Sequence, residues 1–302
     1  MNFYCHNHQN KAFNYVNALK LAGHKETEKE IADFLLIDID VLSRGVLIKK
    51  FHSQGKQTFL YPHTGRPILQ WDGWYPPSEM VTAVFTMAQG GIDIPTMYGY
   101  NSAPIHAVGW SYTDILEFQP CEEPKKVLFA PIHVNGNGFM THRERSTNSK
   151  VFHKLLNTEG IDLTVRHIHP LEWNGLWVES GVDYVQGQPD QNTEDIHRAD
   201  VVVSHQNMAY MAVAMGKPTL MMAEHLTPIS GNTNKNVREV KSWDLYKDDL
   251  MFPLDILSGD TREMLKRACK DDHEIRSWRE RFIGESFQHD KFVELVENYV
   301  RA

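Results

Sequence analysis

The sequence has few of the features that mark membrane proteins or secreted proteins. No apolar run approaches the roughly 20 residues that cross a bilayer, and residues 1–10 are polar, without the core of a signal peptide. Only three cysteines occur, Cys5, Cys121 and Cys269, which predicts neither a disulfide framework nor a zinc site. This cysteine usage fits a reducing compartment, so we expect a cytoplasmic protein with no membrane span.

The chain also has fewer basic than acidic residues. The 31 Lys and Arg residues against 39 Asp and Glu residues give a net charge of −8, which argues against a general electrostatic grip on nucleic acid. A DNA partner would therefore need a local basic groove, for which Lys49, Lys50, Arg143 and Arg145 are the first candidates. The sequence leaves the oligomeric state open.

What the chain does contain is an alternation of apolar runs and helical periods. Its 302 residues suffice for two domains of about 150 residues each. Short apolar runs that end in polar turns predict strands at 2–5, 31–41, 57–61, 105–108, 126–131, 161–167, 182–185, 201–203 and 219–222. Periodicity and capping signals predict helices at 12–20, 42–55, 79–87, 149–156, 193–197 and 208–215, with a helical region over 261–299.

This alternation falls into two halves and predicts an α/β protein of two domains. Residues 1–118 form the first expected domain, and residues 126–280 form the second. Residues 119–125 are polar and contain Pro120 and Pro124, which is typical of a linker. The C-terminal helix, within residues 281–302, is expected to pack back on the first domain.

The most informative stretch lies between the expected strand 201–203 and the expected helix 208–215. Its polar residues are Ser204, His205, Gln206 and Asn207. Ligands bind at the carboxyl ends of strands in open α/β sheets, and a helix N-terminus favours anions such as a diphosphate. The stretch is therefore a candidate donor site, although an ordinary strand–helix turn without a ligand explains it equally well.

Further candidates follow other strands of the second half. The loop of Asn135, Gly136, Asn137 and Gly138 allows backbone N–H groups to approach a phosphate, but it is neither a P-loop nor a dinucleotide fingerprint. His167 and His169 point to one side of a strand and suit phosphate better than a metal, since no third ligand is evident. Glu224 follows the strand 219–222 and could hold a sugar or ribose hydroxyl.

A second histidine turn ends a strand of the first half. His63 follows the strand 57–61, and a neutral imidazole with a pKa near ~6.5 can take a proton from a hydroxyl group at neutral pH. His63 is the expected general base, with His8 in the first turn as the reserve. The competing interpretation is a turn whose histidine only caps backbone groups.

Laid out in order, these segments resemble the GT-B type of two-domain glycosyltransferase. The nearer similarity is to the CDP-glycerol glycerophosphotransferases and to the nucleotide-sugar transferases and epimerases of that fold. Tyr61 to Pro67 is similar to the family's Trp-His-Gly-Thr-Pro turn, which carries a proposed catalytic histidine. The other matching segments are Ala107 to Asp114, Val127 to Pro131, Val165 to Pro170, Ala199 to Ser204 and Gly216 to Pro218.

The chain departs from the family pattern within the donor half. Ser204 to Asn207 stand where the glycerophosphotransferases have Asp-Tyr-Ser-Ser, and Ile132 to Val134 replace their Thr-Trp-Arg. The expected helix 208–215 has no carboxylate of the kind that often holds ribose. These departures leave the donor open. The basic and hydrophobic extension with which teichoic-acid enzymes are expected to dock on membranes is also not evident, so we favour a sugar transferase over a glycerophosphate transferase.

The resemblance implies two Rossmann-like domains facing a cleft and a metal-independent glycosyltransferase without a cofactor. A nucleotide-activated sugar would be the donor. The acceptor would be a hydroxyl group on a glycan, on a small molecule or on a modified nucleobase in DNA, the last unsupported by the net charge. The alternatives are a glycerophosphotransferase, a nucleotide-sugar epimerase and, least favoured, a non-catalytic nucleotide-binding protein.

Overall fold

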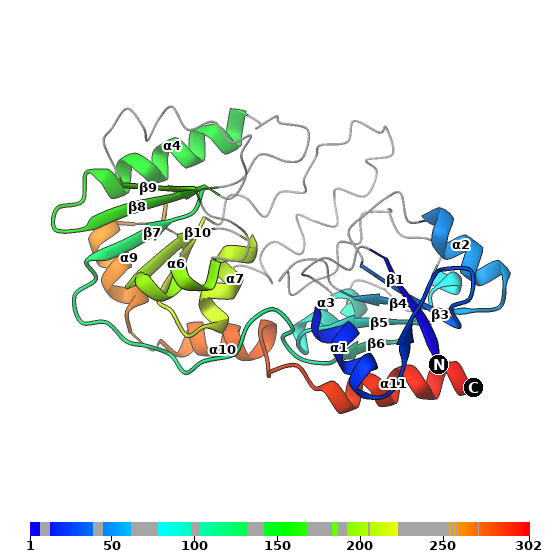
Figure 1. The fold of residues 1–302 in the computed structure, drawn as a ribbon. Coiled ribbons are helices and arrows are strands. Elements are labelled where there is room, and N and C mark those ends of the chain that lie inside the picture. Colours follow the sequence, from blue (N-terminus) through cyan, green and yellow to red (C-terminus); the bar gives the residue numbers. More distant parts are fainter. Residues whose placement is uncertain are drawn as a thin grey trace. The chain divides into compact units, whose positions relative to one another are not determined.

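The computed structural model divides the chain into two compact units. Unit 1 comprises Met1–Asp114 and Glu280–Ala302, and unit 2 comprises Ile115–Arg279 (Figure 1). The residues that the structure describes are 1–6, 13–38, 45–61, 78–97, 103–131, 142–167, 183–186, 192–204, 206–222, 254, 256–257, 259–270 and 272–302.

Unit 1 is built on a parallel sheet of six strands in the order β2-β1-β3-β4-β5-β6. All its neighbouring strands run parallel. The strands are β1 (Asn2–His6), β2 (Lys25–Glu26), β3 (Phe34–Asp38), β4 (Gln57–Tyr61), β5 (Ala83–Thr86) and β6 (Ile105–Ala107). The helices are α1 (Phe13–Leu21), α2 (Gly45–Ser53), the 3₁₀ turn η2 (Ser78–Met80), α3 (Gly90–Met97) and α11 (His289–Arg301).

Successive side chains along each strand point to opposite faces of this sheet, so apolar residues form two cores, one on each face. On one face, Phe34 and Phe59 pack with buried residues of α1 and α11, among them Tyr15 and Phe292. On the other face, Leu35 and its neighbours pack against α2. The last helix of the chain is thus part of the core of unit 1.

One helix predicted from the sequence of unit 1 is wrong. We expected a helix over residues 79–87, but the structure places a short 3₁₀ turn at Ser78–Met80 and the strand β5 at Ala83–Thr86. All four residues of β5 are buried, and the strand pairs with β4 and β6. Val84, Phe85 and Thr86 are β-branched or aromatic, so they suit a buried strand better than a helix.

A histidine in unit 1, His106, is expected to make the stability of the protein depend on pH. His106 lies within hydrogen-bonding distance of the Tyr299 hydroxyl of α11, 3.0 Å away. Burial lowers the pKa of His106, and the nearby Lys291 lowers it further. The folded chain therefore binds this proton less readily than the unfolded chain, so the contribution of His106 to stability is intact above pH ~6.5. It is lost as the pH falls from there through the lowered pKa.

We expect the free energy of unfolding to fall between pH 7.5 and 5.5, and His106→Gln to reduce this fall. Urea unfolding followed at both pH values measures it. His24 also has a pKa lowered mainly by burial, so part of the fall will remain in the variant. An identical fall in the variant and in the native chain would contradict the assignment to His106.

Unit 2 contains a second parallel sheet, of five strands in the order β11-β10-β7-β8-β9. Its strands are β7 (Lys126–Phe129), β8 (Asp162–His167), β9 (Asp183–Gln186), β10 (Val201–Ser204) and β11 (Thr219–Met221). Its helices are α4 (His142–Leu156), α6 (Asn192–Arg198), α7 (Gln206–Ala214), α9 (Thr261–Ala268) and α10 (His273–Phe282), the last of which runs across the boundary between the units.

The core of unit 2 joins this sheet to the helices of its second half. Leu128 and Val202, from β7 and β10, pack with Ile196 of α6 and with Met208 and Ala212 of α7. Among the helices that the structure describes, none is long and apolar enough to cross a membrane. The strands predicted at 126–131, 161–167, 201–203 and 219–222 and the helix at 208–215 are confirmed to within a few residues.

Candidate functional site

The candidate site of unit 2 lies at the carboxyl edge of its sheet. β7 is the central strand and pairs with β8 on one side and with β10 on the other. His167 is the last residue of β8, and Ser204 is the last residue of β10. Because all strands of this sheet run parallel, both predicted site residues end their strands at the same edge, where α/β sheets bind ligands.

Ser204 is a buried residue that ties two strand ends together. Its side chain is almost fully buried, and its hydroxyl donates a hydrogen bond to the Ala130 carbonyl oxygen, 3.0 Å away. Its own carbonyl oxygen accepts from the backbone N–H of Met222. Ser204 thereby fixes where β10 ends relative to the chain that follows β7 and β11.

The helix α7 begins directly beyond this strand end. It starts at Gln206, and its Ala209 and Ala212 are fully buried. The first turn of a helix carries N–H groups without intrahelical acceptors and the positive end of the helix dipole. The strand β10 and the helix α7 together therefore place a helix N-terminus, a feature that favours anions, at the carboxyl edge.

The other end of α7 is held by a close backbone contact. Gly216, beyond its last turn, has a φ of 70°, and an added Cβ would lie 2.0 Å from the Glu117 carbonyl oxygen. Around it, the Leu116 N–H donates to the Ala214 carbonyl oxygen and the Gln119 N–H donates to that of Gly216. Glycine is required here by its conformation and by the space available.

An ion pair next to His167 was not anticipated from the sequence. Arg166 of β8 is fully buried, and its guanidinium group pairs with the Asp195 carboxylate of α6. A buried arginine requires such partners, because an uncompensated charge in the protein interior is costly. The signal in the sequence was an arginine directly before the histidine of an apolar strand.

Several predicted site residues lie outside the described residues. These are His8, His63, Asn135, Gly136, Asn137, Gly138, His169, His205 and Glu224. For His167, Gln206 and Asn207 the structure describes the backbone but not the side chain. Their roles stay predictions, and the backbone of β8 and α7 places the last three at the carboxyl edge.

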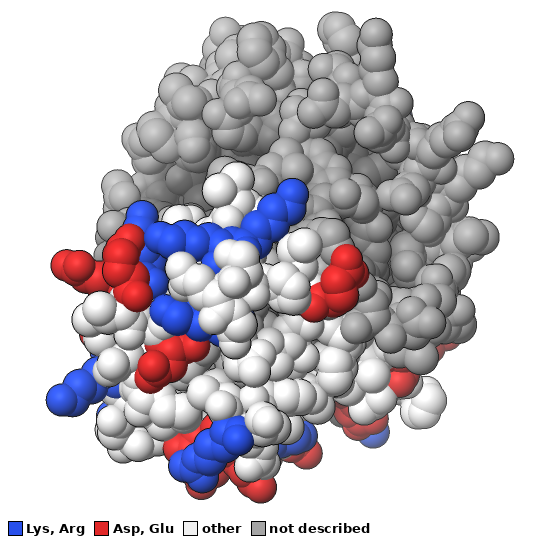
Figure 2. All heavy atoms as spheres, turned by 90° about the vertical axis from the view of Figure 1, so that its right-hand side faces the viewer, with Lys and Arg blue, Asp and Glu red and all other residues white. Residues whose placement is uncertain are grey.

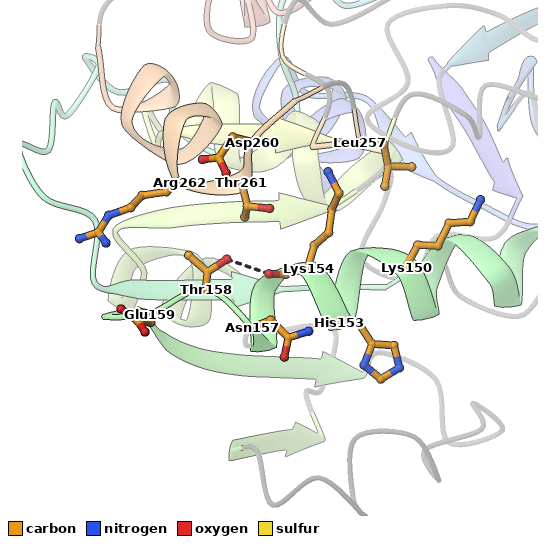
Figure 3. Close-up of a pocket in the computed structure, with 10 residues that line it drawn as sticks. All are labelled: Lys150, His153, Lys154, Asn157, Thr158, Glu159, Leu257, Asp260, Thr261 and Arg262. Atoms are coloured by element: carbon orange, nitrogen blue, oxygen red, sulfur yellow. Dashed lines mark hydrogen bonds between the residues drawn. The ribbon is translucent and has the colours of Figure 1, made fainter.

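A separate pocket of about 770 Å³ lies in unit 2 between α4 and the start of α9 (Figure 3). The Lys154 ammonium group donates to the Gly259 carbonyl oxygen, 2.9 Å away, and Thr158 donates to the Lys154 carbonyl oxygen. Lys154 lies in the last turn of α4 and Thr158 in the turn after it, which leads into the amino end of β8. Among the described residues that line this pocket, none is a predicted donor residue.

The basic groove that a DNA acceptor would need is tested only in part, because Arg143 and Arg145 lie on α4 of unit 2 and their side chains are outside the described part of the structure. Lys50 lies 3.5 Å from the Glu30 carboxylate, and the Lys56 ammonium group donates to the Glu30 carbonyl oxygen. In Figure 2, the described basic side chains of this face stand among acidic ones. Such interleaving gives local ion pairs rather than a continuous basic track.

Two parallel sheets, one in each unit, define an α/β protein of the Rossmann-like class, and comparison with solved structures places the fold within the GT-B type. The UDP-GlcNAc 2-epimerase from Methanocaldococcus jannaschii matches with a TM-score of 0.60 at 9% identity, covering 100% of both chains. The glycosyltransferase SnogD from Streptomyces nogalater matches with a TM-score of 0.59 at 12% identity, over 98% of this chain and 99% of that one.

The wall teichoic acid polymerase TagF also matches, with a TM-score of 0.56 at 9% identity, over 99% of this chain and 88% of that one. No family model matches the sequence, and no curated protein matches it. The expected GT-B type of α/β fold is confirmed by these structures. At such low identities the likeness shows the fold alone.

Proposed function

We propose that this protein is a nucleotide-sugar enzyme, and that its reaction is the transfer of a sugar to a hydroxyl acceptor. The observation that carries the proposal is the strand–helix motif formed by β10 and α7. It sets a helix N-terminus at the carboxyl edge of a parallel sheet, beside the neighbouring strand β7 and two strands from β8. Neighbours of the same fold named as a glycosyltransferase and as a UDP-GlcNAc epimerase support this class of substrate.

In the proposed reaction the donor diphosphate lies at the N-terminus of α7. Backbone N–H groups of that turn, His169 and the loop Asn135 to Gly138 neutralise the charge that develops on the leaving nucleotide diphosphate. His63 accepts the proton of the acceptor hydroxyl, and the hydroxyl oxygen forms the new bond to the anomeric carbon. The bond from that carbon to the diphosphate oxygen breaks. Because hydrogen-bond donors and the helix dipole stabilise the leaving diphosphate, we expect the reaction to need no divalent metal.

An epimerase is the second candidate, because a UDP-GlcNAc 2-epimerase matches over the full length of both chains. The two reactions differ in their products. A transferase releases a nucleoside diphosphate only when a suitable acceptor is present, apart from slow hydrolysis of the donor. An epimerase converts one nucleotide sugar into its epimer without an acceptor. Incubation with the bound nucleotide sugar, with and without candidate acceptors, distinguishes the two by chromatography.

Thermal unfolding with a panel of nucleotides tests the proposed donor class. We expect a nucleoside diphosphate or its sugar ester to raise Tm by about 4 °C at a hundred times its Kd. The matched control is the nucleoside monophosphate, which has one phosphate fewer for the helix N-terminus and should raise Tm less. Repeating the panel with a metal chelator tests metal independence. If no nucleoside diphosphate or nucleotide sugar shifts Tm, the proposed donor class is wrong.

A further inference from the structure

Two cysteines far apart in the sequence meet in unit 2. Cys121 lies in the segment that leads from β6 to β7, and Cys269 is the C-cap residue of α9. The Cys121 backbone N–H donates to the Cys269 carbonyl oxygen, 3.3 Å away, and the two side chains are in contact. A disulfide requires Cα atoms about 4.4–6.8 Å apart, and the direct backbone hydrogen bond holds the backbones of these two residues side by side.

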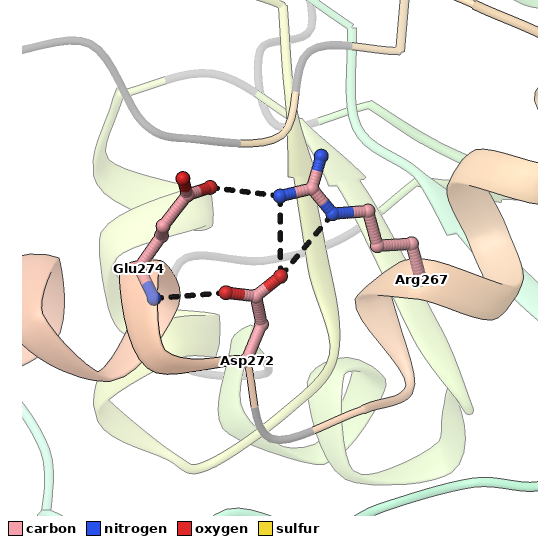
Figure 4. Close-up of polar contacts among 3 residues, drawn as sticks. All are labelled: Arg267, Asp272 and Glu274. Carbon is pink, nitrogen blue, oxygen red and sulfur yellow. Dashed lines mark hydrogen bonds and ion pairs between the residues drawn. The ribbon is translucent and has the colours of Figure 1, made fainter.

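The backbone around Cys269 is held by a polar network (Figure 4). Arg267 of α9 pairs with the Asp272 carboxylate at 3.1 Å and with that of Glu274 at 2.8 Å. The other oxygen of Asp272 accepts the backbone N–H of Glu274 at the start of α10. These contacts link α9 to the start of α10, the helices before and after Cys269.

The two thiols differ in their exposure to solvent. Cys121 is partly exposed, whereas Cys269 is 2% exposed. Burial raises the pKa of the Cys269 thiol to about 12, and the neighbouring Cys121 and Asp200 side chains add to the rise. An external reagent therefore meets Cys121 first, and Cys269 stays a protonated thiol beside it.

We propose that Cys121 and Cys269 form a reversible disulfide by exchange with a low-molecular-weight disulfide of the glutathione class. The Cys121 thiolate attacks one sulfur of the reagent, whose S–S bond breaks and releases one thiol. The Cys269 sulfur, after giving its proton to solvent, attacks the Cys121 sulfur of the mixed disulfide and releases the second thiol. The protein loses two electrons and two protons, and the reagent is reduced to two thiols.

The disulfide would secure the segment that precedes β7 to the end of α9, both within unit 2. Hydrogen bonds to the Ala214 and Gly216 carbonyl oxygens already hold this segment at the end of α7. The cysteines lie about 150 residues apart along the chain, and cross-links that close long loops restrict the unfolded chain strongly. Oxidation therefore stabilises the folded state of unit 2, and this inference is independent of the proposed reaction.

The test uses the full chain equilibrated in oxidised or reduced glutathione, followed by acid quenching, alkylation and peptide mapping. We expect a cross-linked peptide containing Cys121 and Cys269 after oxidation, and its disappearance after reduction. Oxidation should raise Tm by about 5 °C or more. Cys121→Ser and Cys269→Ser should each abolish the cross-link and this rise, whereas Cys5→Ser should leave both unchanged, because Cys5 lies on β1 in unit 1.

Two results would overturn the inference. One is that both thiols of the native chain remain alkylatable after prolonged incubation with oxidised glutathione. The other is a stable mixed disulfide on Cys121 with no cross-linked peptide. Should Cys269→Ser fail to fold, the peptide map of the native chain and the partly exposed Cys121→Ser variant still decide the matter.

Discussion

Replacing His63 by alanine is expected to lower turnover by about 10²–10⁴-fold while the nucleotide donor still binds. The proposed base acts on the acceptor hydroxyl, whereas the donor diphosphate is assigned to the β10–α7 unit and the loops of unit 2. The loss of the His63 imidazole should therefore reduce kcat, and the nucleotide donor should still raise Tm. Steady-state rates and thermal unfolding of the same variant measure both effects.

His63→Gln and His8→Ala serve as matched controls for this experiment. Glutamine retains hydrogen-bonding capacity in the turn but cannot accept the proton, so it should be as inactive as alanine. His8→Ala should retain activity if His63 is the base, and it should lose activity if the reserve assignment holds. Unchanged turnover in His63→Ala would refute its role as the base, and recovery in His63→Gln would indicate a structural role in the turn.

Gly216→Ala is expected to destabilise the protein by about 3 kcal/mol or more, which places it among the severe single substitutions. The new Cβ would lie 2.0 Å from the Glu117 carbonyl oxygen and 3.0 Å from that of Leu116. Backbone atoms cannot move aside as a flexible side chain can. The segment at the end of α7 must shift, and its hydrogen bonds to Ala214 and Gly216 are put at risk.

Gly160→Ala provides the matched control. Gly160 has a φ of 78°, close to the 70° of Gly216, but an added Cβ there meets nothing within 4 Å. It should cost only the ~1–2 kcal/mol of a left-handed conformation. Urea unfolding of both variants isolates the steric contribution as their difference. Equal destabilisation would show that the close contact with Glu117 does not carry the effect.

The parallel α/β class was predictable because buried strands in such sheets are short, apolar and β-branched. Val201 to Val203 followed by a polar turn and a helix ending at Gly216 is a local pattern, and the structure confirms it. The same reasoning was wrong for residues 79–87, for which capping and periodicity predicted a helix. Burial in the middle of the sheet decided that segment in favour of β5.

The carboxyl-edge position of His167 and Ser204 also followed from local pattern, since each ends a recognisable strand. Arg166 was passed over because a lone arginine in a strand gives no indication of its partner. Asp195 stands on a different helix, and only the packing of α6 on the sheet brings the carboxylate to the guanidinium group. The roles of His63, His8 and the Asn135 to Gly138 loop await the experiments above.

By itself, then, the sequence determined the alternation of strands and helices, the GT-B type of α/β fold and the strand ends at which polar residues gather. The alternation and the strand ends depend on periodicity, capping and turn residues within a few positions of one another. The GT-B type was inferred from the resemblance of the ordered motifs to that family. The tertiary structure alone decided the order of the strands, the pairing of Arg166 with Asp195 and the meeting of Cys121 with Cys269. Each of these joins residues distant in the chain, and such contacts arise from the burial of complementary surfaces, which no local pattern encodes.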